Sequence, residues 1–391
     1  MPAYPDLGPP LKIRRMLNES PASWWLTLLV TYGLLRASDL LFLWVVARRD
    51  GVGLGRYLIS WDAEWAFKAI QSGWPADPIR QPDGVLEQST LAWPPLYPLT
   101  VRVAGMFVGE SRTYLLMVVV NLAAGALAMV LIARLFMNQR SRAWGLYVAI
   151  IWASLPAAAV LVLGYAEGIF MLLIFAALLA VSRNRWIVAG IAIAGAGLAK
   201  SSVAPFAAAI AVVALVAMWR TPMAWRAWLG PIIALLLSAF AVLAWPAFVA
   251  SRVGQIDGYA QVQQAWGWST GPFLDSWNTL LFAGTDPTRE PFIFLGSFVV
   301  MVVAAYLMWR RSEVPLVARV SGVFVPAFWA LSGAAAVSTM RYLLPNPAVS
   351  WLVASLARTW VGIAFLMLVL AVGRYLWLAV YVSWVIPYPP P

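Results

Sequence analysis

Apolar runs long enough to cross a lipid bilayer recur along most of this 391-residue chain. A helix needs about 20 consecutive apolar residues to span about 30 Å of hydrocarbon. Hydrophobic residues make up 62% of the chain and charged residues only 11%, whereas an ordinary soluble domain has about 25% charged residues. The runs do not alternate apolar and polar residues, as the strands of a membrane barrel do. We therefore predict an all-α, polytopic membrane protein.

Cysteine and histidine are both absent from the chain. Without cysteine there are no disulfides, thiolate nucleophiles or thiolate metal sites. Without histidine a general base must be Asp, Glu, Lys or Tyr, and carboxylates are favoured; imidazole-based metal clusters are also excluded. We expect no metal or other cofactor. The net charge is +11, but the basic residues gather in short loops, which is typical of membrane topology rather than of nucleic-acid binding.

The basic residues also predict how the chain lies in the membrane. Lys12, Arg14 and Arg15 precede the first apolar run, which places the N-terminus in the cytosol by the positive-inside rule. The piece Leu99–Val108 is too short to cross, and treating it as re-entrant keeps every compact basic loop in the cytosol. We expect about 11 transmembrane helices, at approximately 23–47, 113–137, 144–163, 166–182, 186–199, 204–219, 229–249, 291–308, 317–336, 343–357 and 360–382.

On this topology two large polar loops, 50–113 and 250–290, lie on the extracytoplasmic side of a single domain that covers 1–391. We expect the first loop to carry interfacial helices, and the two loops to form a polar chamber lined by carboxylates. Of the 16 acidic residues, 12 fall on the outer side, and the exceptions are Asp6, Glu19, Asp39 and Glu313.

Two charged residues lie inside the first apolar run. Arg36 and Asp39 have i,i+3 spacing, which puts them on one helix face. A lone charge within a membrane is costly, so the spacing predicts a structural ion pair in preference to a proton or ion relay. Arg374, in the last predicted span, has no explanation in the sequence.

Asp62 is the main candidate for chemistry. Ser60 is suited to cap a helix that runs to about Ser72 and is ended by Gly73 and Pro75. In the first turn of that helix the ionised carboxylate of Asp62 is stabilised by the helix N-terminus. Such a carboxylate at an aqueous boundary is suited to accept a proton from an attacking hydroxyl. The simpler alternative is that Asp62 only complements the helix dipole.

Other polar residues near the predicted outer boundary are candidates for binding. Glu64 precedes Lys68 by four residues, which favours a helix-surface ion pair over contact with a substrate. Glu167 is suited either to hold a sugar hydroxyl or to cap the next helix. Lys200 and Arg341 are suited to neutralise a phosphate leaving group, or to extend toward lipid headgroups. The aromatic and amide candidates for binding a sugar or acceptor are Tyr165, Gln264, Trp266 and Tyr342.

Short segments in a characteristic order resemble a known family. They are Trp61-Asp62, Pro95-Leu96-Tyr97-Pro98, Tyr165-Ala166-Glu167, Ala265-Trp266-Gly267 and Arg341-Tyr342. Together they resemble the second mannosyltransferase of glycosylphosphatidylinositol-anchor assembly and its bacterial homologues, among the membrane-embedded GT-C glycosyltransferases. The resemblance adds Tyr97 to the candidates for sugar or acceptor binding. The chain departs from the family pattern at Ala66, Trp74, Ala166 and Lys200.

The resemblance implies a GT-C-like fold and a reaction. A sugar, usually mannose, would pass with inversion from a polyprenyl-phosphate donor to a glycolipid, glycan or protein acceptor, with Asp62 as the catalytic base. It also implies an active site on the lumenal or periplasmic side, in agreement with the topology above. We expect an integral protein of a bacterial plasma membrane, with membrane lipids and no nucleic acid among its partners.

Two other classes of protein remain open. A transporter or lipid flippase would also be polytopic, with Arg36 and Asp39 as its coupling pair, but intramembrane charge is sparse and no inverted repeat is visible. A non-catalytic subunit of an envelope-building complex would use its polar outer loops as binding surfaces.

Overall fold

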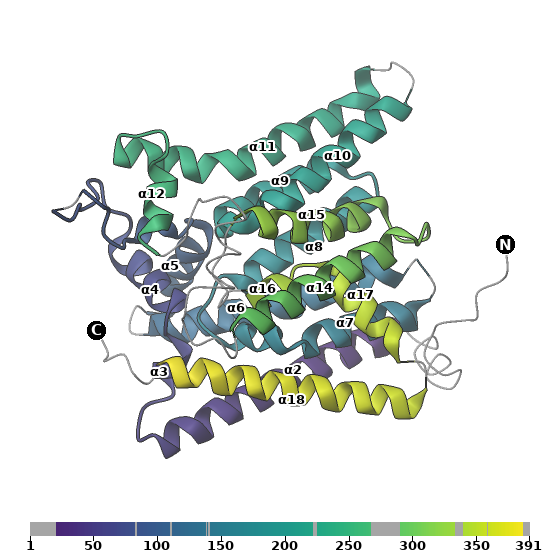
Figure 1. The fold of residues 1–391 in the computed structure, drawn as a ribbon, viewed down its shortest axis with the longest axis horizontal. Helices are drawn as coiled ribbons and strands as arrows, with labels where there is room; N and C mark the ends of the chain where they lie inside the picture. The colour runs from purple at the N-terminus through teal and green to yellow at the C-terminus, as the bar shows by residue number, and fades with distance from the viewer. Residues whose placement is uncertain are drawn as a thin grey trace.

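Helices make up the regular structure of the residues that the structure describes, which confirms the predicted fold class. A computed structural model describes residues 21–82, 84–109, 112–137, 139, 141–221, 225–266, 290–332, 339–357 and 359–385. The α-helices, drawn in Figure 1, are α2 (Pro21–Arg49), α3 (Gly55–Leu58), α4 (Asp62–Ser72), α5 (Leu96–Val108), α6 (Thr113–Met137), α7 (Arg142–Ser154), α8 (Glu167–Ser182), α9 (Trp186–Ala199), α10 (Ala204–Arg220), α11 (Trp225–Val253), α12 (Gly258–Gln264), α14 (Glu290–Trp309), α15 (Leu316–Ser332), α16 (Thr339–Leu343), α17 (Pro347–Leu356) and α18 (Trp360–Val385).

Several of these helices are suited to cross a membrane. Within the described ranges 5 are long and apolar enough, and a bent pair, α7 with the 3-10 helix η3 (Pro156–Val162), would make a sixth crossing. Further apolar helices, α5 among them, have only 10–17 residues. The figure of about 11 spans stays a prediction, because it needs the bent pair and several of the shorter helices to cross as well.

The predicted span 144–163 is broken near its middle, and Pro156 explains the break. α7 ends at Ser154 and η3 begins at Pro156, with Leu155 between them at φ −53° and ψ 144°. Proline lacks a backbone N–H and disfavours the helical conformation of the residue before it. The chain bends by 76° between the two helices. The predicted span over 144–163 is therefore not one continuous helix, and the break leaves backbone carbonyls that need other donors.

Arg36 of α2 supplies donors to that break. Its guanidinium donates to the carbonyl of Ala153 at 2.7 Å and also to the carbonyl of Ala158. Asp39 lies 3.3 Å from Arg36 and 2.8 Å from Arg374 of α18, and all three charged side chains are buried. The predicted pairing of Arg36 with Asp39 is confirmed. Arg374 is the third member of the group and joins α18 to α2.

Replacing Asp39 by Asn is expected to destabilise the protein strongly, because two buried guanidinium groups would lose their counter-ion. Removing one partner of a buried ion pair costs about 3–5 kcal/mol. The measurement is thermal unfolding of the purified protein in detergent. Adding Arg374→Met to Asp39→Asn should recover part of the loss, since it removes one unpaired charge. An Asp39→Asn protein that unfolds at the wild-type temperature would contradict this role.

The helices that carry the candidate site pack closely through small residues. α6 contacts α8, α8 contacts α9, and α9 contacts α11. Gly168 in α8 faces the backbone of Asn121 in α6, and Gly197 in α9 faces the backbone of Ala241 in α11, so a methyl group at either glycine would collide with that backbone. Small residues let membrane helices approach each other in this way. α8 also packs on α9, and Glu167 at the start of α8 lies 2.5 Å from Lys200 just beyond α9.

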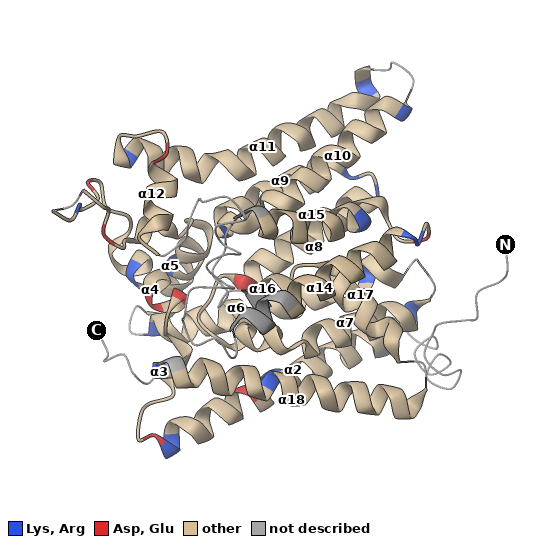
Figure 2. Cartoon of the chain, viewed as in Figure 1, with Lys and Arg blue, Asp and Glu red and all other residues tan. Residues whose placement is uncertain are grey.

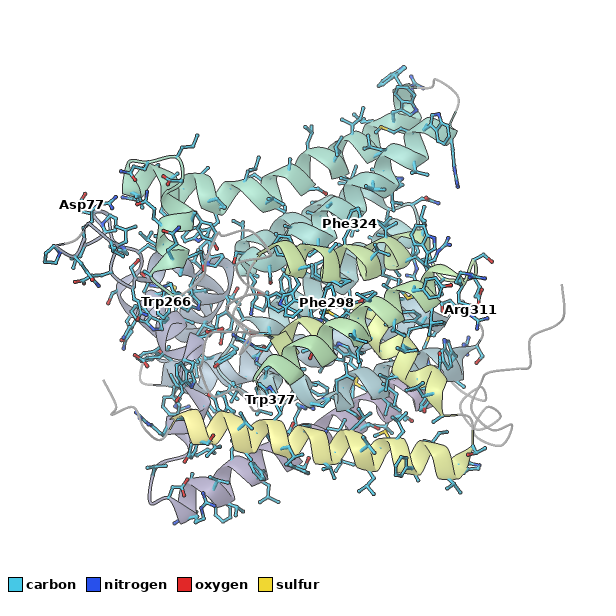
Figure 3. All side chains as sticks on the ribbon, viewed as in Figure 1. Asp77, Trp266, Phe298, Arg311, Phe324 and Trp377 are labelled. Atoms are coloured by element: carbon cyan, nitrogen blue, oxygen red, sulfur yellow. The ribbon has the colours of Figure 1, made fainter. Side chains whose placement is uncertain are left out.

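The two ends of this helix bundle differ in charge, as Figure 2 shows. α4, α12 and the loop around Asp77 lie together at one end, which we call the α4–α12 end (Figure 1). Most of the acidic residues visible in Figure 2 are there. Figure 3 places Asp77 and Trp266 at this end and Arg311 at the opposite one. The predicted loop 250–290 is described as far as Trp266 and again from Glu290; the rest of that loop lies outside the described residues.

Candidate functional site

Side chains from α4, α8, α16 and the end of α9 form a compact group of charges. Arg341 Nη1 lies 2.5 Å from Asp62 Oδ2 and 3.2 Å from Glu167 Oε1. Lys200 Nζ lies 2.5 Å from the same Glu167 oxygen. We call Asp62, Glu167, Lys200 and Arg341 the charge cluster. Within it Arg341 contacts both carboxylates, and Glu167 contacts both cations.

Local helix geometry favours each charge where it lies. Asp62 begins α4 and Glu167 begins α8, and a helix N-terminus stabilises a carboxylate. Lys200 directly follows the last residue of α9, where a cation is favoured. Arg341 lies in the short helix α16, and Trp152 of α7 donates to the carbonyl of Leu344 just beyond it at 2.9 Å. The helix ends thus stabilise the charges of Asp62, Glu167 and Lys200, and tertiary packing brings these residues together with Arg341.

Ser60 does not cap α4, contrary to the prediction from the sequence. Its hydroxyl donates to the carbonyl of Arg56 instead. The residue before α4 is Trp61, with φ 57° and ψ −120°. A positive φ is costly for a bulky residue, so the surrounding structure must hold Trp61 in this conformation. As a result Asp62 is the first residue of the helix, rather than the second.

Asn121 of α6 fixes the start of α8. Its amide nitrogen donates to the carbonyls of Val160 at 3.1 Å and Leu163 at 2.8 Å, and its oxygen accepts from the backbone N–H of Gly168 at 2.5 Å. The side chain is fully buried. Because Gly168 follows Glu167, these bonds set the position of the Glu167 carboxylate. Sequence reasoning missed Asn121, since a single amide within an apolar run shows no partner.

Replacing Asn121 by Leu is expected to lower the unfolding temperature and to displace Glu167. The change keeps the branching at Cγ but replaces the amide by apolar methyl groups, which leaves two carbonyls and one N–H without their partner, at about 1–3 kcal/mol for each buried group. Thermal unfolding in detergent tests the first effect. Ser355→Ala is a suitable control, because the Ser355 hydroxyl bonds only back to the carbonyl of Trp351 at 2.8 Å. Equal unfolding temperatures for the two variants would count against the role of Asn121.

Members of the charge cluster differ in their access to solvent. The Asp62 side chain is 33% exposed and Arg341 19%, whereas Glu167 is 2% exposed. Burial works to raise the pKa of the Asp62 carboxyl, but the charges of Arg341 and Lys200 and the hydrogen bond from Arg341 hold that pKa below its usual value. Asp62 is therefore ionised at neutral pH, and Arg341 weakens it as a base.

Of the other predicted residues, Tyr165 contacts Arg341 of the charge cluster. The Arg341 guanidinium carbon is 5.5 Å from the centre of the Tyr165 ring, within the range of a cation–π contact. Tyr342 follows Arg341 in α16 and is half-buried. Tyr381 of α18, which sequence reasoning missed, shares a hydrogen bond with Tyr165 and donates to the carbonyl of Tyr57 at 2.8 Å. No sequence pattern marks a tyrosine so far along the chain as part of this site.

Two predicted residues are engaged in other contacts. Tyr97 is 1% exposed, and its hydroxyl donates to the carbonyl of Met117 at 3.1 Å. Glu64 lies 2.7 Å from Lys68, the surface pair that their spacing predicts. This geometry favours a packing role for Tyr97 and a helix-surface role for Glu64 over contact with a sugar. It likewise favours Glu167 as the buried partner of both cations.

Gln264 and Trp266 lie where α12 meets the first loop. The Trp266 ring packs edge-on at 4.7 Å against both Trp65 and Trp93. Gln264 lines an open cavity of about 470 Å³, together with Gln81, Val85, Leu86, Glu87, Gln88 and Ala265. No member of the charge cluster lines this cavity. Trp65, one helical turn after Asp62 in α4, connects the two regions.

Comparisons with known proteins bear on the fold. Neither a protein-family model nor the sequence of a curated protein matches the chain. The crystal structure of ArnT from Cupriavidus metallidurans bound to undecaprenyl phosphate is similar, with 14% identity, a TM-score of 0.50, and 82% of this chain and 59% of that chain covered. The Archaeoglobus fulgidus oligosaccharyltransferase tethered to an acceptor peptide has 13% identity, 92% and 55% coverage, and a TM-score of 0.48, which is too low to carry an argument.

The chain thus spans somewhat more than half the length of these solved structures. At such low identity the likeness shows the fold alone, and the narrower resemblance to the second mannosyltransferase of glycosylphosphatidylinositol-anchor assembly stays a prediction. The all-helical architecture, the long apolar helices and the likeness to ArnT together identify the fold of this chain as that of the GT-C glycosyltransferases.

Proposed function

We propose that this protein is a membrane glycosyltransferase that moves a sugar, in the first instance mannose, from a polyprenyl-phosphate donor to a hydroxyl of a glycolipid, glycan or protein acceptor. The observation that carries the proposal is the contact of Asp62 with Arg341 at 2.5 Å. A partly exposed carboxylate, suited to accept a proton, lies beside a cation suited to bind a phosphate. The likeness of the fold to ArnT, a protein solved with undecaprenyl phosphate bound, supports a lipid phosphate as the carrier.

In the proposed reaction Asp62 takes the proton of the acceptor hydroxyl while the oxygen of that hydroxyl attacks the anomeric carbon of the donor sugar. The bond from that carbon to the phosphate oxygen breaks, and its electron pair leaves with the phosphate. Attack from the face opposite the phosphate inverts the anomeric carbon. Arg341 and Lys200 stabilise the charge that develops on the leaving phosphate.

The proposed setting is a bacterial plasma membrane, with the α4–α12 end on the periplasmic side. Arg311 at the opposite end fits the positive-inside rule, by which basic residues lie on the cytosolic side. Membrane lipids would surround the apolar helices and deliver the donor. The transporter alternative gains no support from Arg36 and Asp39, because Asp39 is also paired with Arg374 and all three side chains are buried.

The test is a transfer assay with the purified full-length protein, polyprenyl-phosphate mannose and total membrane lipid, followed by mass analysis. We expect a product heavier by one hexose, formed together with free polyprenyl phosphate. Success only with another polyprenyl-linked sugar would revise the sugar and keep the reaction class. Movement of a substrate across vesicles with no glycosidic product would reject the proposal in favour of transport.

A further inference from the structure

The charge cluster pairs two groups that the proposed reaction needs apart. Asp62 has to accept a proton and Arg341 has to meet a phosphate, yet they contact each other at 2.5 Å. We propose that Arg341 exchanges partners, so that the donor phosphate displaces Asp62 from Arg341 and thereby frees the base. This inference rests on the proposed function and adds an order of events, in which the donor binds before the acceptor is activated.

The positions of the two carboxylates indicate which one gives way. Arg341 Nη1 contacts Asp62 and, at 3.2 Å, Glu167. Asp62 is 33% exposed and Glu167 only 2% exposed, so the guanidinium is more accessible to a donor phosphate on its Asp62 side. Glu167 stays behind as a positioning residue, because it also holds Lys200 at 2.5 Å. Glu167 then holds both Arg341 and Lys200 in position to contact the phosphate.

The charges make this a competition between anions. Asp62 and Glu167 balance Arg341 and Lys200, so the charge cluster offers no excess positive charge to a phosphate. A sugar phosphodiester carries one negative charge, and it therefore replaces Asp62 on Arg341 instead of adding to the pair. The other titratable groups near Asp62 are Glu167, Lys200, Tyr165, Tyr342 and Tyr381.

Departure of Arg341 changes the strength of the base. Arg341 is a main reason why the pKa of Asp62 lies below its usual value, so its removal raises that pKa. Lys200 remains occupied by Glu167, and the tyrosines are neutral at pH 7. After transfer the acceptor proton is on Asp62, and the polyprenyl phosphate carries the electron pair of the broken bond. Release of that phosphate returns Arg341 to Asp62, which then gives its proton to solvent.

The experiment measures binding of a polyprenyl methyl phosphate to the full-length protein in detergent by titration calorimetry. This phosphodiester carries one negative charge, does not titrate near pH 5 and has no sugar to transfer. Asp62→Asn should bind it about tenfold more tightly than the wild type, because Arg341 no longer has to leave a carboxylate. Titration in buffers of different ionisation enthalpy should show proton uptake near pH 5 in the wild type and none in Asp62→Asn. Asp62→Ala is the second variant if Asp62→Asn folds poorly.

Asp77→Asn is the matched control, since Asp77 is an exposed carboxylate at the same end and the substitution changes the net charge equally. It should bind the probe as the wild type does, with the same proton uptake. Equal or weaker binding by Asp62→Asn, or no binding by any of these proteins, would overturn the exchange. Tighter binding by Asp62→Asn, with no sugar transfer by the wild type, would reject the proposed function and leave the exchange standing.

Discussion

Replacing Asp62 by Asn is expected to lower the rate of sugar transfer by about 10²–10⁴-fold at saturating donor, the range that a general base contributes. Asn keeps the shape of the side chain at the start of α4 but has no carboxylate to accept the acceptor proton. The measurement is the initial rate of hexose transfer by purified protein that elutes from a size-exclusion column at the same volume as the wild type. Asp77→Asn should transfer sugar at the wild-type rate, and a folded Asp62→Asn protein that does the same would remove Asp62 from the mechanism.

The pH dependence of the wild-type protein follows from the same group. The pKa of Asp62 in the free protein is held below its usual value by Arg341 and Lys200, so the carboxylate is ionised above that pKa and is lost as a base when the pH falls through it. The kcat/KM for the donor reports the free protein, and kcat reports the donor-bound protein. If Arg341 leaves Asp62 on donor binding, the acid limb of kcat lies at a higher pH than that of kcat/KM. Coincident limbs would contradict the exchange.

Replacing Arg341 by Gln is expected to lower kcat/KM for the donor by about 10²–10³-fold, the loss typical of one group that stabilises charge in a transition state. The change removes the cation that contacts both Asp62 and Glu167 and that would meet the phosphate. Arg341→Lys should be intermediate, because an ammonium keeps the charge but lacks the planar fork of a guanidinium.

The control for Arg341 is Arg49→Gln. The Arg49 side chain is 71% exposed and pairs with Asp50 at the surface, and such pairs contribute little. Steady-state kinetics with varied donor concentration compare the two variants. Equal kcat/KM values for Arg341→Gln and Arg49→Gln would mean that Arg341 does not bind the donor phosphate.

The fold class could be read from the chain because helices that cross a bilayer must be long, apolar and internally hydrogen-bonded. The same reasoning did not foresee the break within the predicted span 144–163, although Pro156 was visible in the sequence, because apolar character continues across the break. The start of α4 was also assigned wrongly. A single Ser before a helical stretch is a weak capping signal, and the conformation of Trp61 depends on what surrounds it.

For the candidate site, the sequence singled out Asp62 at the start of a helix in the first outer loop, and Lys200 and Arg341 at the ends of apolar runs. It assigned Glu167 to a sugar hydroxyl or a helix cap, whereas the structure shows it between the two cations. Arg374 had no explanation until α18 was seen beside α2. In each case the missing information is a contact between helices, for which a single sequence has no local pattern.

The order of residues was enough to predict a bundle of membrane helices and to select charged candidates for the site, because the cost of burying charge in lipid leaves few positions for them. The contact of Asp62 with Arg341, 279 residues apart, and the contacts of Glu167 with both cations became visible only in the folded chain. Such contacts depend on how closely the helices pack and where they begin, and here the close packing at Gly168 and the bonds of Asn121 set the start of α8, where Glu167 lies.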